Sequence, residues 1–482
     1  MIAGIFRNNY KAIILTGCIS YVFSKFFLAL GPIFTIGLLG ALLIFLVALF
    51  DIKKIFWFLF IWLTVIGILS NLTIIGRIGF ISYIDDLLVF LLIVRLFFLQ
   101  SNLHLSRNLQ ILSVFIGIFI FITVISGLVN ASKPIVIINY ASTYLKILVL
   151  IISLNVFLTK EEISGYIKFV FFVMLFQALF ASIQFFSYGR GNFFVGHEIS
   201  GVTGVFDSAR GFFGKYGAHK LGHFSLIVFI VSTSLFIYTQ RKKWLFYMFS
   251  SLFSLIISFT EHDYPFVLFF ILFAAMRYFR IRFHAYVRLI FIMSVVVLTT
   301  AVLVFAYKND FSLTKRFFDL TKSTRTILNT GKAQAFLLTE KIVFQNPVTF
   351  MFGVGPGNYS GPIAEKAGVG TYFKKYVQFR EEKVKSTLDY WWSSFITLIG
   401  EVGVLGLIFF LAPYFFIKKI SHEVMKREGS SNFDKGVSFA VPAIITFFIF
   451  ISFISNQIEW LEVTFPFAIF AAYIFKLEET KA

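Results

Sequence analysis

The sequence is short of cysteine and of charged residues, and each shortage excludes a class of protein. Cys18 is the only cysteine among 482 residues, which rules out an intramolecular disulfide and a metal cluster held by cysteines. Charged residues make up 14% of the chain, whereas soluble domains carry about 25%. Hydrophobic residues make up 58%. The composition therefore predicts a membrane protein rather than a soluble one.

Several short motifs are also missing. The sequence has no His-Glu-x-x-His or other metal spacing, no Asp-x-Asp and no Gly-Lys-Ser/Thr. A metal-dependent nucleotide-sugar site and a Walker loop are therefore not expected, and we predict no cofactor. The net charge of +19 comes without a nucleic-acid motif. We interpret it as orientation signals and as an indication of an anionic ligand, not of nucleic acid.

What is abundant is long apolar runs. A membrane-spanning helix needs roughly 20 apolar residues. Such runs lie near 11–31, 34–50, 55–72, 80–99, 109–129, 135–158, 163–187, 222–240, 244–260, 264–280, 286–307, 391–416, 437–455 and 460–476. The first lacks a small-residue cleavage site, and we interpret it as a retained span. The fold class predicted is an all-α polytopic membrane protein with about 14 transmembrane helices, 12–14 allowing for uncertain divisions.

Basic residues in the short loops predict the orientation, because cytoplasmic loops are enriched in Lys and Arg. With fourteen spans, all of these clusters fall on the cytoplasmic side, together with both termini. The clusters are Arg7 and Lys11, Lys53 and Lys54, Arg107, Lys160, Arg241 to Lys243, Arg277 to Arg288, Lys418 to Arg427, and Lys476 and Lys481.

Two long loops then fall on the outer face. The expected division is a bundle of about seven helices over 1–187, a basic outer loop over 188–221, helices 8–11 over 222–307, a large outer loop over 308–390, and C-terminal helices with a cytoplasmic tail over 391–482. The second loop is too long for a passive connection. The loops interleave aromatic residues with basic ones, which suits sugar rings and phosphate oxygens. A solvated loop surface is the alternative.

One local pattern lies within the large loop, and another lies in the span that follows it. Gly353, Gly355 and Gly357 lie in Asn-Pro-Val-Thr-Phe-Met-Phe-Gly-Val-Gly-Pro-Gly-Asn-Tyr, where a turn can aim backbone N–H groups at an anion. A plain tight turn is the alternative. Glu401 lies two to three turns into the following span. A carboxylate within a membrane indicates function, unless it pairs with a Ser or a backbone group.

Other acidic residues gave weaker indications. Asp85 and Asp86 lie in the fourth span, and Arg95 is about 15 Å further along the helix, too far to pair with Asp85. We expect these aspartates to pair with other helices rather than to form a proton relay. Glu261-His-Asp is interpreted as the polar tip of an outer hairpin, with metal binding or acid–base chemistry as the alternative.

Three further sequence segments can be compared with known families. The first is Arg210-Gly-Phe-Phe-Gly with Leu221-Gly-His-Phe; the second is Gly331-Lys332 with Asn346-Pro and Gly353-Val-Gly-Pro-Gly; the third is Leu398-x-x-Glu-x-Gly-x-x-Gly. Together with the arrangement of spans and loops, they resemble the bacterial O-antigen ligase and polymerase family. The resemblance implies a GT-C-like membrane glycosyltransferase that uses undecaprenyl-pyrophosphate-linked glycans. The chain departs from the ligases, because Trp392 and Ser393 stand where those enzymes have a His-Asn pair. A polymerase is therefore the preferred interpretation.

The resemblance also implies site residues. Arg210, Arg316 and Arg325 are expected to contact the pyrophosphate and to stabilise its charge without metal, Arg210 and Arg325 acting as catalytic residues and Arg316 in binding. Lys215 and Lys332 are expected to support them, together with Gly353, Gly355, Gly357 and Glu401. Asp389 or His223 is a candidate base. The expected partners are the undecaprenyl-pyrophosphate-linked glycan, membrane lipid and a chain-length regulator protein.

The implied location is the bacterial plasma (inner) membrane, with the active loops periplasmic or extracellular. The products expected are O-antigen, capsule or exopolysaccharide, the first a part of lipopolysaccharide. A ligase that moves finished glycan to an acceptor is one alternative. A flippase or transporter is the second, and would be expected to carry charges along a central cavity. A sensor or other non-enzymatic membrane protein is the third.

Overall fold

The computed structural model describes residues 52–71, 84–99, 105–187, 209, 211–213, 217–258, 263–282, 339–341, 343–359, 393–455 and 460–479. Contacts divide the chain into residues Met1–Phe58 and Leu59–Ala482. Of the first unit, only the residues at the start of one helix are described. The arrangement below concerns the second unit.

Within the described ranges the secondary structure is helical. The helices are α3 (Ile52–Asn71), α4 (Ile84–Leu99), α5 (Arg107–Val129), α6 (Pro134–Phe157), α7 (Lys160–Ser187), α8 (Gly217–Thr239), α9 (Lys242–Ser258), α10 (Tyr264–Arg282), α15 (Pro347–Phe352), α18 (Ser394–Lys426), α19 (Asn432–Ile454) and α20 (Leu461–Glu479). Every apolar run that falls in these ranges forms a helix. The runs near 11–31, 34–50 and 286–307 lie outside the described residues.

Six described helices, α5, α6, α7, α8, α18 and α19, are long and apolar enough to cross a membrane. Large apolar side chains point outward from them, including Phe121, Phe172 and Phe186, which are 64%, 54% and 73% exposed. A water-facing surface would not tolerate so many exposed aromatic rings, whereas lipid does. The chain is thus an α-helical membrane protein. The total of about fourteen spans and the side on which each loop lies stay predictions.

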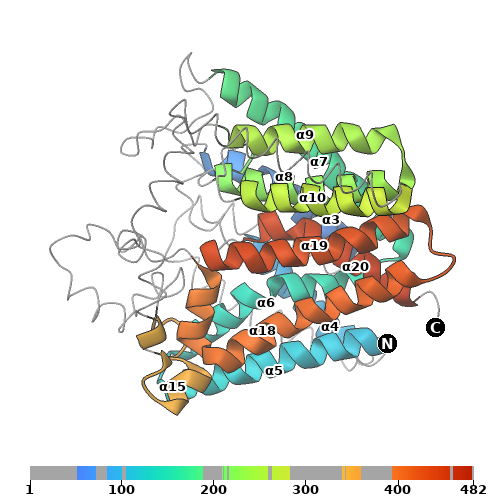
Figure 1. The fold of residues 1–482 in the computed structure, drawn as a ribbon. Helices are drawn as coiled ribbons and strands as arrows, with labels where there is room; N and C mark the ends of the chain where they lie inside the picture. Colours follow the sequence, from blue (N-terminus) through green and yellow to red (C-terminus); the bar gives the residue numbers. More distant parts are fainter. Residues whose placement is uncertain are drawn as a thin grey trace, which may run out of the picture. The chain divides into compact units, whose positions relative to one another are not determined.

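The helices of this unit lie side by side along a common direction (Figure 1). α8 packs against α9 and α19, α18 against α19 and α5, and α20 against α6 and α7. The short helix α15 contacts α18 and α5. It comes from the middle of the predicted large outer loop, so that part of the loop is held against two spans.

Local sequence explains where several helices start. Ser106 accepts a hydrogen bond from the Leu109 N–H and caps α5. Ser431 and Asp434 form a capping box at the start of α19. α8 begins at Gly217 rather than near residue 222, so His219 and Lys220 are helical and not part of the first outer loop.

Candidate functional site

α18 is broken inside its span. Gly403 has φ 71° and ψ −172°, a conformation open essentially to glycine alone. An interruption leaves the preceding carbonyls without helical partners, and a buried carbonyl needs one. Here the Val354 N–H donates to the Gly400 carbonyl at 2.9 Å and the Gly355 N–H donates to the Glu401 carbonyl at 3.0 Å. The turn after α15 therefore completes the broken helix.

Glu401 is the acidic group at this break, and its side chain is fully buried. The Gly357 N–H donates to the Glu401 carboxylate (Oε2) at 3.0 Å. The Ser126 hydroxyl of α5 donates to the Glu401 carbonyl at 2.8 Å and also lies within hydrogen-bonding distance of the Phe352 carbonyl. The glycine turn points one N–H group, that of Gly357, at an anion, and that anion is the protein's own carboxylate.

Glycine is required on both sides of this contact. A Cβ built on Gly353 would lie 2.5 Å from the Glu401 carbonyl carbon and 2.6 Å from its oxygen. A Cβ on Gly403 would lie 2.4 Å from the Met351 carbonyl and 2.6 Å from the Phe352 nitrogen. Because these neighbours are backbone atoms, they cannot rotate away. The two backbones can approach this closely only without side chains.

The connection between α5 and α6 also bonds to the turn after α15. Asn130 Nδ2 donates to the Gly353 carbonyl at 3.3 Å, and the Ser132 hydroxyl donates to the Pro356 carbonyl at 3.0 Å. Asn358 Nδ2 donates to Ser132 Oγ at 3.2 Å. We call the turn 353–359, the break at 400–403 and residues 126–132 together the glycine junction.

Four of the predicted binding residues lie in the glycine junction: Gly353, Gly355, Gly357 and Glu401. Their N–H and carboxylate groups have the intramolecular partners given above, and the Gly353 N–H donates to the Thr349 carbonyl at 2.8 Å. The alternative that the Glu401 carboxylate pairs with a backbone group is met by the Gly357 N–H, whereas Ser126 donates to the Glu401 backbone carbonyl. Contact of these residues with a substrate stays a prediction.

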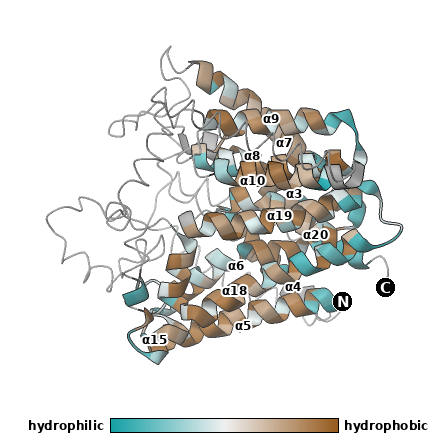
Figure 2. Cartoon of the chain, viewed as in Figure 1, coloured by the Kyte–Doolittle hydropathy of each residue, from teal (hydrophilic) through white to brown (hydrophobic). Residues whose placement is uncertain are grey.

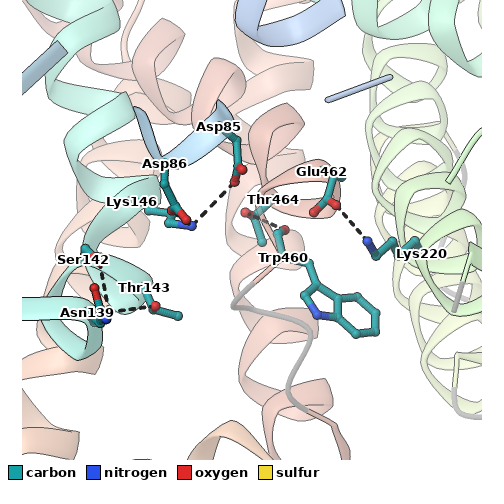
Figure 3. A network of polar contacts seen from close by, with 10 residues as sticks. All are labelled: Asp85, Asp86, Asn139, Ser142, Thr143, Lys146, Lys220, Trp460, Glu462 and Thr464. Carbon is teal, nitrogen blue, oxygen red and sulfur yellow. Dashed lines mark hydrogen bonds and ion pairs between the residues drawn. The ribbon is translucent and has the colours of Figure 1, made fainter. Parts of the chain in front are cut away.

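A second group of polar side chains lies among the helices, and Figure 3 shows it from close by. Lys146 of α6 forms an ion pair with Asp86 and lies 3.5 Å from Asp85 of α4. Lys220 of α8 forms an ion pair with Glu462 of α20 at 2.7 Å. The Lys146 ammonium and the Glu462 carboxylate also attract each other electrostatically. We call these five residues the charge cluster.

The charge cluster brings four helices together and carries three carboxylates against two ammonium groups. Trp460 stands beside it, with the Lys220 ammonium 5.2 Å from its ring centroid (Figure 3). Asp85, Asp86 and Glu462 lie in the first turns of their helices, where the helix dipole favours negative charge. The side chains of Lys146, Lys220, Asp85 and Glu462 are 13%, 14%, 16% and 18% exposed, so they are largely but not fully enclosed.

This cluster confirms that Asp85 and Asp86 pair with another helix. The sequence interpretation missed Lys146 and Glu462, although a charged residue in the middle of the run 135–158 and another at the start of 460–476 were visible signals.

His223, the described candidate base, is buried in α8 with 1% of its side chain exposed. Its Nδ1 lies 2.8 Å from Asp263 Oδ1, and Asp263 is fully buried. No described residue hydrogen-bonds to His223 Nε2, and the ring packs near Phe447. The expectation that Glu261-His-Asp forms a polar hairpin tip is wrong for Asp263, because that carboxylate turns inward to the histidine.

The segment next to Arg210 is also held inside the protein. Gln184 of α7 accepts from the Gly211 N–H at 2.8 Å and donates to the Gly211 carbonyl at 3.0 Å. Gln177 accepts from the Phe212 N–H at 2.7 Å, and the Phe212 ring packs on Phe180 at 4.1 Å between centroids. Two buried glutamines thus fix the backbone that follows Arg210.

The other predicted site residues, Arg210, Lys215, Arg316, Arg325, Lys332 and Asp389, lie outside the described residues. Among those described, no group of three or more His, Cys, Asp or Glu side chains is placed to hold a metal ion. In comparisons with known proteins, no protein-family model and no curated protein matches the chain.

Proposed function

We propose that the chain polymerises undecaprenyl-pyrophosphate-linked oligosaccharide repeat units into O-antigen, capsule or exopolysaccharide at the outer leaflet of the bacterial plasma membrane. The observation that supports this most is the glycine junction. Two of the three segments that resemble the polymerase family, Gly353–Gly357 and Glu401–Gly406, lie far apart in the sequence and bond directly to each other. Two segments that resemble the family and also bond to each other support the proposed function better than either segment alone.

The proposed reaction needs cations more than it needs a metal. The bond between the sugar anomeric carbon and the phosphate oxygen breaks, and undecaprenyl pyrophosphate leaves with the electron pair. An acceptor sugar hydroxyl forms the new bond and gives up its proton. Fixed guanidinium groups stabilise the charge on the leaving pyrophosphate. Arg210 and Arg325 are the proposed groups, with Arg316, Lys215 and Lys332 supporting them. Gln177 and Gln184 hold the backbone beside Arg210.

The proton goes to a base that the proposal assigns to Asp389 or His223. His223 has a chemical argument in its favour, because Asp263 faces Nδ1 and would stabilise the imidazolium that forms. Its Nε2 is the nitrogen left to accept a proton. Its burial is the argument against it, because an acceptor hydroxyl must come within about 3 Å of that nitrogen.

A gene deletion tests the proposed function. Single repeat units on the lipid carrier support a polymerase, whereas long chains retained on the carrier indicate the ligase instead. Repeat units trapped on the cytoplasmic side contradict both enzymes. Complementation with Arg210→Ala and Arg325→Ala then tests the site, with Arg241→Ala, in the turn before α9, as a matched control. Full chain extension by both site variants at normal expression would show that the site assignment is wrong.

A flippase or transporter is the second candidate, and the charge cluster is the observation in its favour. Charged groups inside a membrane protein often line a substrate or ion path. The described members, however, are paired with one another rather than spread along the bundle. The deletion separates the two functions, because a flippase acts before repeat units reach the outer leaflet.

A further inference from the structure

A groove runs between α10, α18 and α19, with a volume of about 500 Å³. Phenylalanines make up much of its wall, including Phe266, Phe269 and Phe273 of α10 and Phe439 of α19. The Phe269 ring is 61% exposed, and Phe273 stacks on Phe439 with 5.4 Å between centroids. Figure 2 shows the apolar colouring of both helices. This wall matches a hydrocarbon chain.

One end of the same groove is basic. Arg277 of α10 and Lys418 and His422 of α18 line it. Lys418 and His422 are four residues apart, so they stand on one side of the helix. Tyr238 orients the guanidinium, because Arg277 Nε donates to the Tyr238 hydroxyl at 3.1 Å and the group lies 5.9 Å from the ring centroid. Within the described ranges only Arg277 Nε is seen to donate, so the terminal guanidinium nitrogens can bind another acceptor.

No carboxylate lines this groove in the part of the chain that the structure describes. The groove on the other side of α18 differs, because its charged lining residues are Arg107, Lys419 and Lys476 together with Glu423, Glu478 and Glu479. There the charges are matched, and Lys476 pairs with Glu479 at 2.9 Å. α18 thus separates a groove of mixed charge from one with basic groups only.

We propose that the groove between α10, α18 and α19 binds an anionic membrane phospholipid. Its phosphate lies among Arg277, Lys418 and His422, and an acyl chain lies along the phenylalanines. Free phosphate matches the basic end but not the apolar wall. A zwitterionic lipid matches the wall but not the excess of positive charge. The basic end belongs to the side that the sequence predicts to be cytoplasmic, where anionic lipid attracts basic residues. The inference does not depend on the reaction proposed above.

Lipid binding by the purified full-length protein tests this proposal. Phosphatidylglycerol, phosphatidylcholine and inorganic phosphate are titrated in detergent, with retained lipid counted by native mass spectrometry. The variant is Arg277→Gln with Lys418→Gln, and Lys419→Gln is the matched control in the neighbouring groove. A third variant, Ala443→Phe, fills the groove without changing charge. Melting temperatures without lipid establish that each variant folds.

We expect phosphatidylglycerol to bind selectively. The double variant should lose about thirty-fold in affinity, at about five-fold for each basic residue removed. Ala443→Phe should also weaken binding, and Lys419→Gln should leave it nearly unchanged. Three results would overturn the proposal: equal binding of phosphatidylcholine, equal stabilisation by inorganic phosphate, or an equal loss in Lys419→Gln. The last would mean a general surface charge and not a site.

Discussion

The glycine junction and the charge cluster both bury polar groups among apolar helices, but they satisfy them differently. In the junction, backbone groups bond to backbone groups across a helix break, and the one carboxylate, Glu401, receives a backbone N–H. In the cluster, five charged side chains from four helices pair with one another. One arrangement is fixed by chain geometry, and the other can rearrange by side-chain rotation.

The two arrangements differ in what they do for the fold. A helix break within a membrane is tolerated only where neighbouring groups satisfy the freed carbonyls. The turn after α15 supplies those groups, and the fold requires it for that reason. The cluster bridges no helix break, although the carboxylates of Asp85 and Glu462 also accept backbone N–H groups in the first turns of α4 and α20. Ionisable residues within a membrane are costly, and their presence is an indication of function.

The largest effect is expected from Gly403→Ala. The new methyl group would meet backbone atoms at 2.4 Å in a conformation that favours glycine alone, for a cost of about 2–6 kcal/mol. The folded fraction should fall sharply in size-exclusion profiles of detergent-solubilised protein. Gly165→Ala, where an added Cβ has nothing within 4 Å, is the control and should fold normally. Equal profiles for the two variants would refute the close approach.

Lys220→Met should come next. It leaves Glu462 buried without its partner, and breaking such a pair costs about 3–5 kcal/mol. The double variant Lys220→Met with Glu462→Met should recover much of that loss, because no unpaired charge remains. A double-mutant cycle on melting temperature measures the coupling. If the two single changes simply add, the pair does not act as a unit.

Glu401→Leu should cost about 1–3 kcal/mol, because it leaves the buried Gly357 N–H without an acceptor. Glu401→Gln keeps an oxygen in the same place and should recover most of the stability. Thermal unfolding of the two variants measures the difference. A Gln variant as unstable as the Leu variant would mean that the negative charge, and not the hydrogen bond, is what the junction needs.

Asp86→Asn should have the smallest effect on stability, at most about 1 kcal/mol, because 40% of this side chain is exposed. If the cluster is functional, glycan chains made in cells should nevertheless shorten. Gel profiles of surface glycan, with expression matched by immunoblot, measure this. An unchanged glycan pattern in both Asp86→Asn and Asp85→Asn would remove the functional argument for the cluster.

The apolar runs predicted helices well because lipid imposes one rule on every span. The sequence did not reveal how polar groups meet between spans. The break at Gly403 was not predicted, because glycine within a span is common and only the partner turn shows that the conformation differs. Asp263 was predicted to be at a hairpin tip, since adjacent Glu and His suggest water. The start of α8 was placed too late because Gly217, His219 and Lys220 look like loop residues.

The measurement that tests the glycine junction most directly is a cross-link. Ser132 Oγ and Asn358 Nδ2 lie 3.2 Å apart, so the two side chains meet, and a disulfide between cysteines at these positions tests that contact. In a chain carrying Cys18→Ser, the pair Ser132→Cys and Asn358→Cys should form an intramolecular disulfide under mild oxidation. Oxidation should then block maleimide labelling until a reductant is added. The pair Ser132→Cys and Ser250→Cys should stay labelled. Equal labelling of both pairs after oxidation would contradict the docking of the large loop on the broken helix.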